Sequence, residues 1–463
     1  MNAVRRGSAA DPARVLALRI LVAFEEHPAP VGDAIDRAQR SLERVEDRGL
    51  VQNLVLQVIR HRARLDWVLE KVLSGGGLVE LTPWIRNTLR LGLAQIVLLP
   101  RIPPHAAVDT SVELAKRFGH SGTAGLTNAV LRRLVKEARP FWDGARGVDR
   151  RATLALIHSA PRWLVERWCE RWGEDAAARR LAWSSEPPGH WLRFAAAGPA
   201  LERVLVDDSP EAKPREGTHR GWIPDTVRLD PRMDPTALPG FAERAFTIQD
   251  GSAILIGMLP PRVRGVVIDA CAAPGTKTAH LAARAEEETT LVAVDSHWKR
   301  LRKVPGAFAP AEVAPSSVRP HLAAADARRL PFRTGLDGIL IDAPCSNLGV
   351  LRRRPELRWR IDEASIRALA ETQRELLDEA AGRVAAGGWL LYSVCTIEPE
   401  ETTAQRDRFL AAHPEFTPIE LPHLIPSGAR AREGEMLLLP GDHETDGGYA
   451  FLVERGPSRT GAV

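Results

Sequence analysis

The feature that most limits the fold of this chain is a change of hydrophobic period part-way along it. Up to about residue 140, apolar residues recur at spacings of three and four, as they do in helices that bury one face. From Gly265 onward, short apolar runs alternate with helix-like segments. Strands that alternate with helices are typical of a doubly wound, mostly parallel sheet. The sequence therefore predicts an all-α region followed by an α/β domain.

Helix start and stop signals support the first half of this prediction. Asp11-Pro12 and Thr82-Pro83 each combine an N-cap residue with proline at the first helical position, and Gly75, Gly76 and Gly77 form a stop. Helices are expected over residues 48–73, 84–99, 108–118 and 122–138.

With 463 residues, the chain is long enough for about three domains. We place them at 1–142, 150–245 and 246–456, with a polar, glycine-containing joint at 143–149. In the middle region we expect a helix over 161–183, whose tryptophans pack in a core, and a short strand over 191–194.

Composition excludes several classes of protein. Apolar residues make up 44% and charged residues 26%, as in an ordinary globular protein, and no apolar run reaches the roughly 18 residues of a membrane span. No cleavable leader is evident, so we expect a cytoplasmic protein. Four scattered cysteines without a C-x-x-C pair argue against a disulfide framework and structural zinc. Of the 63 basic residues only seven are lysine, which fits either codon bias or phosphate recognition by arginine.

The first chemical motif follows the expected strand 265–269. It reads Asp-Ala-Cys-Ala-Ala-Pro-Gly-Thr-Lys-Thr over 269–278 and precedes a helix. Small residues there let the backbone approach a ligand at a helix N-terminus. A phosphate loop would need glycine at 270 and 276, where this chain has alanine and threonine.

Acidic residues follow the next strands. Asp295 ends the strand expected over 290–295 and could accept hydrogen bonds from a ribose diol. Asp326 would close a strand over 318–325 and could meet an adenine amino group. The spacing therefore fits an adenosine ligand.

Two cysteines also lie at expected strand ends. Cys345 follows Asp342 after the strand 336–342, and Cys395 ends the strand 388–395. Ligands bind at the carboxyl edge of such sheets, so both thiols are candidate active-site groups.

Together these motifs resemble the bacterial ribosomal-RNA cytosine carbon-5 methyltransferases of the Sun/Fmu (RsmB-like) family, over nearly the full length. The motifs, in order, are D-A-C-A-A-P-G-x-K-T, V-A-V-D, D-A-P-C-S, R-R-R-P-E-L-R-W and Y-S-V-C-T. The helical N-terminal region is similar to NusB-like RNA-binding domains. The resemblance implies a Rossmann-like catalytic domain that uses S-adenosylmethionine, no metal, and ribosomal RNA as substrate.

The resemblance also implies roles for residues. Cys395 would be the nucleophile that adds to cytosine carbon 6, Cys345 would act in product release, and Asp342 would bind the base. The cofactor site would be formed by Cys271, Ala272, Ala273, Pro274, Gly275, Thr276, Lys277, Asp295, Asp326 and Asp342. DNA cytosine methyltransferases use a Pro-Cys nucleophile instead, so the reverse assignment of the two thiols stays open.

RNA contacts are expected beside the Pro-Cys loop. The candidates are Arg352, Arg353, Arg354, Arg358 and Trp359, with the arginines on phosphates and the tryptophan stacked on an unpaired base. The alternative is a solvated charged loop. The middle region 150–245 is also expected to bind RNA.

Two positions depart from the family pattern. Thr276 and Asn347 stand where the family usually has glycine. A β-branched residue tolerates positive φ poorly, whereas asparagine adopts it more readily. The rival functions are a non-catalytic RNA-binding or assembly factor and, with less support, a redox or zinc protein.

Overall fold

The computed structural model describes residues 11–195, 198–207, 209, 213–308 and 318–457. It divides into two compact units. The helical unit contains the described residues up to Glu186 together with Leu351–Arg360, and the sheet unit contains Pro187–Val350 and the chain from Ile361 onward. The chain therefore leaves the sheet unit once, for ten residues, directly after the Pro-Cys loop.

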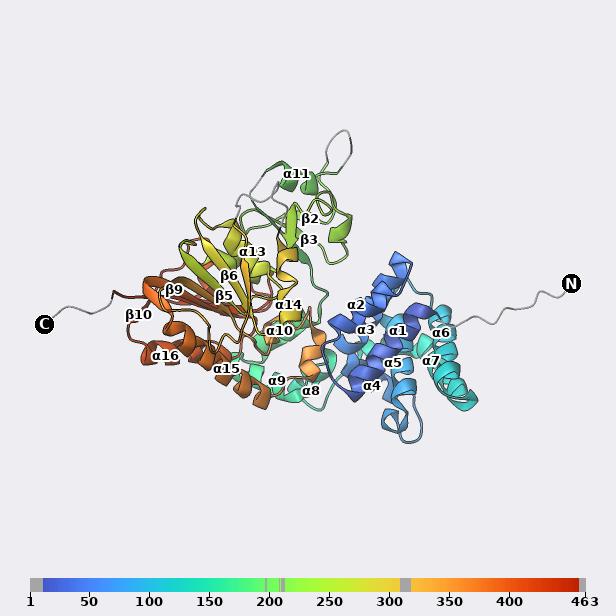
Figure 1. Ribbon diagram of the computed structural model, residues 1–463. Coiled ribbons are helices and arrows are strands. Elements are labelled where there is room, and N and C mark those ends of the chain that lie inside the picture. Colours follow the sequence, from blue (N-terminus) through green and yellow to red (C-terminus); the bar gives the residue numbers. More distant parts are fainter. Residues whose placement is uncertain (1–10, 196–197, 208, 210–212, 309–317, 458–463) are drawn as a thin grey trace. The chain divides into compact units, whose positions relative to one another are not determined.

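The helical unit confirms the predicted all-α class (Figure 1). Its helices are α1 (Pro12–Glu26), α2 (Gly32–Arg40), α3 (Val45–Arg60), α4 (Arg62–Glu70), α5 (Pro83–Leu98), α6 (Pro104–Phe118), α7 (Ser121–Asp143), α8 (Arg150–Ile157), α9 (Arg162–Trp172) and α10 (Glu174–Ser185). Short 3₁₀ turns, η1 (Leu78–Glu80) and η5 (Pro355–Trp359), complete it.

Both predicted helix starts are confirmed. The Asp11 carboxylate accepts hydrogen bonds from two backbone N–H groups of the first turn of α1, and the Thr82 hydroxyl accepts one from the first turn of α5. Two predicted helices are each broken in two. The helix over 48–73 breaks at His61, whose backbone is not helical, and the helix over 161–183 breaks at Gly173, where φ is 78°. Glycine adopts that angle without strain, so the sequence signal was present.

The predicted middle region, 150–245, is divided between the units. Helices α8 to α10 belong to the helical unit, whereas the following strands belong to the sheet unit. These strands form a small antiparallel sheet in the order β2-β3-β1-β4, and α11 (Pro199–Leu205) packs nearby. Their bounds are β1 (His190–Phe194), β2 (Thr218–Arg220), β3 (Thr226–Leu229) and β4 (Phe246–Ile248). The predicted strand over 191–194 is confirmed.

The large sheet confirms the α/β prediction. Five neighbouring strands, in the order β7-β6-β5-β8-β9, are parallel, and β13 adds to β9 in antiparallel direction. The parallel strands are β5 (Val266–Ala270), β6 (Thr290–Asp295), β7 (His321–Ala324), β8 (Leu336–Asp342) and β9 (Val384–Val394). The antiparallel edge contains β10 (Phe416–Pro418), β11 (Arg430–Arg432), β12 (Glu435–Leu438) and β13 (Gly448–Arg455).

Helices cover both faces of this sheet, which is the doubly wound arrangement. Alternate residues of each parallel strand point to opposite faces, so Val267 packs in one core with α12 and α13, while Ile268 packs in the other with α15. The helices are α12 (Gly251–Met258), α13 (Thr276–Ala283), α14 (Trp298–Leu301), α15 (Glu363–Ala381) and α16 (Thr403–Ala412). Within the described residues, no helix has the length and hydrophobicity of a membrane span.

Candidate active site

The candidate site lies at the carboxyl edge of the five parallel strands. The chain goes from β5 to β6 on one side and reaches β8 on the other side of β5, so the strand order reverses at β5. Ligands of doubly wound sheets bind beside such a reversal, so the loops that leave β5 and β8 are where a ligand is expected. The predicted motifs at 271–277 and 342–346 occupy these two loops.

The loop after β5 brings backbone close to where such a ligand would lie. Gly275 has φ 108°, and a Cβ there would lie 2.8 Å from the Cα of Val304, so no other residue fits without a shift. Thr276 is the first residue of α13 and is not among the residues with positive φ. The expected strain at Thr276 is therefore absent, because the required glycine is its neighbour.

Asp269 is a fully buried carboxylate beneath this loop. Its Oδ2 accepts a hydrogen bond from the Thr278 hydroxyl at 2.6 Å, whereas its Oδ1 has no partner within the described residues. Burial raises the pKa of Asp269 from 3.8 to about 7. Burial likewise raises the pKa of the Cys271 thiol, which disfavours a thiolate there.

Lys277 and Asp342 form an ion pair that joins the two loops. The Lys277 ammonium lies 2.7 Å from Oδ2 of Asp342, and the Ser393 hydroxyl donates to Oδ1 of the same carboxylate at 2.9 Å. Asp342 keeps a third of its side chain exposed, so it can also contact a bound molecule.

The structure brings the two predicted thiols together. The sulfur atoms of Cys345 and Cys395 are 3.4 Å apart, although fifty residues separate them in the chain. Cys345 is buried, whereas Cys395 is partly exposed. The hydrogen bond with Cys395, and then burial, raise the pKa of Cys345 well above its ordinary value. Cys345 therefore keeps its proton more strongly than a free thiol does.

A network that sequence reasoning missed supports the Pro-Cys loop. The buried Glu401 carboxylate accepts hydrogen bonds from the Ser346 backbone N–H at 2.8 Å and from the Gln373 amide at 3.0 Å. The Ser346 hydroxyl contacts both Glu401 and Thr396. Burial raises the pKa of Glu401. Apart from the closeness of Glu401 to Cys395, the sequence carries no signal for this network.

Asn347 was also missed as a site residue. Its φ is 58°, which confirms that asparagine keeps the left-handed conformation at this position. Its carboxamide contacts both cysteines, the thiol of Cys395 and the carbonyl of Cys345.

The two remaining acidic candidates differ. Asp295 is 5% exposed at the end of β6; its Oδ1 accepts a hydrogen bond from the His297 N–H at 2.9 Å. Asp326 lies beyond the end of β7, is 45% exposed, and pairs with Arg328, which lowers its pKa. Asp295 is thus held at the sheet edge, whereas the Asp326 carboxylate is engaged by its own loop.

The structure corrects the predicted RNA contacts of Arg352 and Arg358, which are buried, whereas Trp359 keeps part of its side chain exposed and stays a prediction. Arg358 is 2% exposed and donates to the carbonyls of His158 at 2.6 Å and Ser184 at 2.9 Å, within the helical unit. The buried Arg352 guanidinium lies over the ring of Trp183, and the Trp359 indole donates to the backbone of α3. These side chains bind the protein itself. Sequence reasoning failed here because a run of arginines has the same composition whether it is solvated or buried.

The other two arginines of the run remain candidates. Arg353 and Arg354 are partly exposed, and Arg354 pairs with Glu356 at 3.4 Å.

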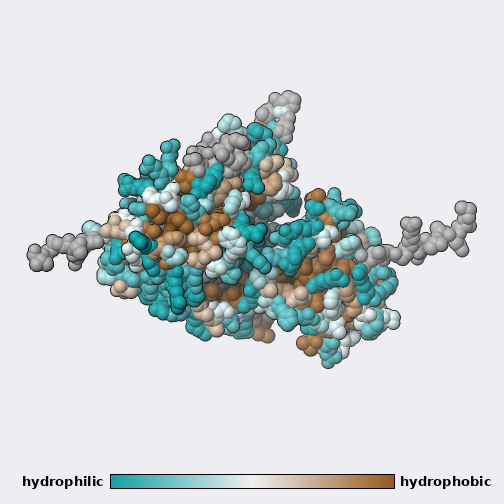
Figure 2. Space-filling view, in the orientation of Figure 1, coloured by the Kyte–Doolittle hydropathy of each residue, from teal (hydrophilic) through white to brown (hydrophobic). Residues whose placement is uncertain are grey.

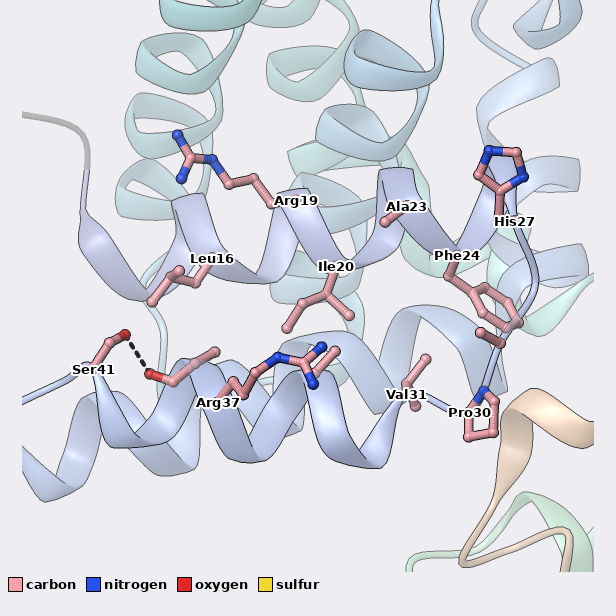
Figure 3. A pocket seen from close by; sticks show the side chains of 13 residues that line it. Leu16, Arg19, Ile20, Ala23, Phe24, His27, Pro30, Val31, Arg37 and Ser41 are labelled. Carbon is pink, nitrogen blue, oxygen red and sulfur yellow. Dashed lines mark hydrogen bonds between the residues drawn. The ribbon is translucent and has the colours of Figure 1, made fainter. Parts of the chain in front are cut away.

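The helical unit has a separate hollow of about 450 Å³ between α1 and α2 (Figure 3). Leu16 and Ile20 of α1 point towards α2, Arg37 of α2 lies between the two helices, and Arg19 projects from the other side of α1. None of its lining residues is acidic. Figure 2 shows hydrophobic residues at the surface over these helices, bordered by hydrophilic ones.

Comparisons with known proteins agree with this arrangement. Residues 256–453 match the family model of the 16S rRNA methyltransferase RsmB/F, and residues 11–136 match the NusB family. The probable ribosomal RNA small subunit methyltransferase B of Bacillus subtilis (strain 168) is 32% identical and covers 96% of this chain and 98% of its own length. Its counterpart from Synechocystis sp. (strain ATCC 27184 / PCC 6803 / Kazusa) is 33% identical, over 96% and 99%.

Solved structures share the fold. PH0851 superposes with a TM-score of 0.74 at 23% identity, covering 97% of this chain and all of the other. NSun6 from Pyrococcus horikoshii, solved with SFG, gives a TM-score of 0.54 at 19% identity, covering 64% and 99%. With relatives matched over almost their whole length, the chain belongs to the RsmB/F family of 16S rRNA methyltransferases and has an N-terminal domain of the NusB family.

Proposed function

We propose that this protein transfers a methyl group from S-adenosylmethionine to carbon 5 of a cytosine in small-subunit ribosomal RNA, through a covalent adduct with Cys395. The observation that carries the proposal is the 3.4 Å separation of the Cys345 and Cys395 sulfur atoms at the carboxyl edge of a methyltransferase sheet. A single reacting base could contact both thiols there.

The residues present fit the cofactor. Gly275 leaves space for close backbone approach, and the Asp295 carboxylate has the chemistry to accept hydrogen bonds from a ribose diol. The unpartnered, buried Oδ1 of Asp269 is a further acceptor beneath the same loop. Cys271 to Lys277, Asp295, Asp326 and Asp342 would form the site, with Asp326 sharing its carboxylate between Arg328 and the adenine amino group. The cofactor supplies an electrophilic methyl group.

Cytosine carbon 5 becomes nucleophilic only after a nucleophile adds to carbon 6. The Cys395 thiol would lose its proton to solvent water as its sulfur forms that bond, and the electron pair of the carbon 5–carbon 6 double bond would be shared between carbon 5 and ring nitrogen 3, so that carbon 5 can accept the methyl group. The Asp342 carboxylate would accept a hydrogen bond from the exocyclic amine; only in its protonated form could Asp342 donate to ring nitrogen 3, where charge develops. Its pairing with Lys277 keeps this carboxylate oriented.

Cys345 would remove the carbon 5 proton after methyl transfer. The pKa of Cys345 is raised first by its hydrogen bond with Cys395. This effect weakens once the Cys395 sulfur is bound to carbon 6. The Cys345 proton would then pass to solvent water, and the resulting thiolate would take the carbon 5 proton. As the carbon 5–hydrogen bond breaks, its electrons re-form the double bond and expel the Cys395 thiolate.

We assign RNA binding to the helical unit as well. The hollow between α1 and α2 combines apolar lining residues with arginines and no acidic lining residue, which suits bases and phosphates. Arg353, Arg354 and the region 150–245 are further candidates.

The test compares Cys345→Ala with Cys395→Ala. Each purified variant is incubated with S-adenosylmethionine and ribosomal RNA or small-subunit particles, and denaturing gels reveal covalent adducts. We expect Cys345→Ala to accumulate an adduct, because methylated cytosine is not released, and Cys395→Ala to form none.

The double variant is the matched control and should form no adduct. Adduct formation by Cys395→Ala, with none by Cys345→Ala, would reverse the two roles. Mass spectrometry of digested RNA identifies the product, and methylation at another atom than carbon 5 would refute the proposed reaction.

A further inference from the structure

Asn347 touches the sulfur that the proposed function assigns as nucleophile. Its Oδ1 lies 2.8 Å from Sγ of Cys395, and its Nδ2 lies 2.5 Å from the carbonyl oxygen of Cys345. The asparagine is held in the left-handed conformation at φ 58°, within the loop that Glu401 binds through Ser346. One side chain therefore connects the backbone at one thiol with the sulfur of the other.

The orientation of this carboxamide follows from its partners. A backbone carbonyl only accepts hydrogen bonds, so the group that faces the Cys345 carbonyl must be the Nδ2 donor. Oδ1 then faces Cys395, and an amide oxygen also only accepts. The Cys395 sulfur must therefore carry its proton to bond with Asn347. A thiolate in the same place would face oxygen lone pairs.

We infer that Asn347 holds Cys395 in the protonated, weakly reactive state in the free enzyme. This inference rests on the proposed function only because it takes Cys395 as the nucleophile. Half a turn of the carboxamide would place Nδ2 opposite the sulfur and give a thiolate a donor, while it breaks the hydrogen bond to Cys345. Asn347 is thus a positioning residue that acts on the protonation of the nucleophile.

An opposing charge lies nearby. The Lys277 ammonium attracts a thiolate at Cys395, but Lys277 is already paired with Asp342 at 2.7 Å. The hydrogen bond that Cys395 donates to Asn347 and the attraction of the cation therefore act on the Cys395 sulfur in opposite senses. Removing the carboxamide should make the sulfur more reactive towards an electrophile.

The test measures alkylation of Cys395 by iodoacetamide in the full-length free enzyme, followed by peptide mass spectrometry. Asn347→Gly is the informative variant, because glycine adopts φ 58° without strain and removes only the carboxamide. We expect Cys395 to react about 2- to 12-fold faster in Asn347→Gly, the range given by the loss of one ordinary hydrogen bond. In Asn347→Asp the added negative charge should slow the reaction below the wild-type rate.

Cys271 serves as the internal control in the same samples. It lies in the loop after β5, so it should keep its wild-type rate in Asn347→Gly, whereas a general loosening of the sheet edge would expose Cys271 and Cys395 together. A wild-type or slower rate at Cys395, or equal acceleration at Cys271 and Cys395, overturns the inference. The assay needs neither RNA nor cofactor, so its outcome is independent of the adduct test of the proposed function.

Discussion

Replacing Asp269 with asparagine should make the sheet unit less sensitive to alkaline pH. The carboxylate is fully buried, one of its oxygens has no partner among the residues that the structure describes, and burial raises its pKa from 3.8 to about 7. The folded state therefore binds a proton at a pH where the unfolded chain has released it. Stability from this group is fully present below about pH 4 and is lost as the pH rises through about 7.

The magnitude follows from the shift. A difference of about three pKa units between the folded and unfolded states changes the free energy of unfolding by about 4 kcal/mol from low to high pH. About 3 kcal/mol of this is lost between pH 5 and pH 8.5. Asparagine does not titrate, and its amide oxygen can still accept from Thr278. Its amide N–H groups, facing the position of the unpartnered oxygen, cost about 1–3 kcal/mol at every pH. This constant cost cancels when the pH dependence is compared.

The assay is urea-induced unfolding at pH 5 and pH 8.5, read by pulsed hydrogen exchange in the β5 peptide of the free enzyme. We expect the free energy of unfolding of Asp269→Asn, relative to wild type, to increase by about 3 kcal/mol between the two pH values. Thr278→Val is the matched variant, because it removes the hydrogen bond that lowers the Asp269 pKa. The free energy of unfolding of Thr278→Val should therefore continue to fall up to a higher pH than that of the wild type. A relative free energy that stays constant from pH 5 to pH 8.5 would refute the argument from burial.

Three further pairs of substitutions test residues of the candidate site and of the segment that follows the Pro-Cys loop. Glu401→Ala should destabilise the sheet unit by about 2–5 kcal/mol, because it leaves the Ser346 N–H without an acceptor. Glu401→Gln should lower the free energy of unfolding much less, and chemical denaturation compares the two variants. Arg358→Lys should destabilise the helical unit by about 2–4 kcal/mol, since one ammonium does not reach all the carbonyls that the guanidinium binds, whereas Arg353→Lys should stay within about 0.5 kcal/mol in the same assay. Gly275→Ala should abolish detectable binding of S-adenosylmethionine in calorimetry while Thr276→Ser retains it, because only position 275 combines φ 108° with a close neighbour.

Sequence reasoning located the candidate site because the carboxyl ends of all strands in a parallel sheet lie at one edge, so residues at predicted strand ends must lie there. The strands 290–295 and 336–342 were predicted with the bounds they have, and the two thiols meet because β8 and β9 are parallel neighbours. The sulfur atoms of Cys345 and Cys395 therefore lie 3.4 Å apart at this edge, although the two residues are fifty positions apart in the chain. No knowledge of side-chain packing was needed for this step.

The supporting residues escaped prediction because their partners are set by tertiary packing. Glu401 binds Ser346 and Gln373, which lie 55 and 28 residues away, and no periodic pattern links the three positions. The position of Asn347 was flagged only as a turn, although its side chain contacts both thiols. A single sequence records that a residue is polar but not which buried donor or acceptor it satisfies.

Arg358 shows how a charged motif can be structural. Helix ends leave backbone carbonyls without partners, and this guanidinium donates to carbonyls that follow α8 and lie in the last turn of α10. A guanidinium has five N–H donors in a rigid fork, so one side chain can donate to acceptors from several elements. The charge of Arg358 is buried in doing so, and this burial lowers the pKa of Arg358. The segment that carries it begins at Leu351, four residues after Asn347. The burial of Arg358 is therefore accounted for by the carbonyls that it binds within the helical unit.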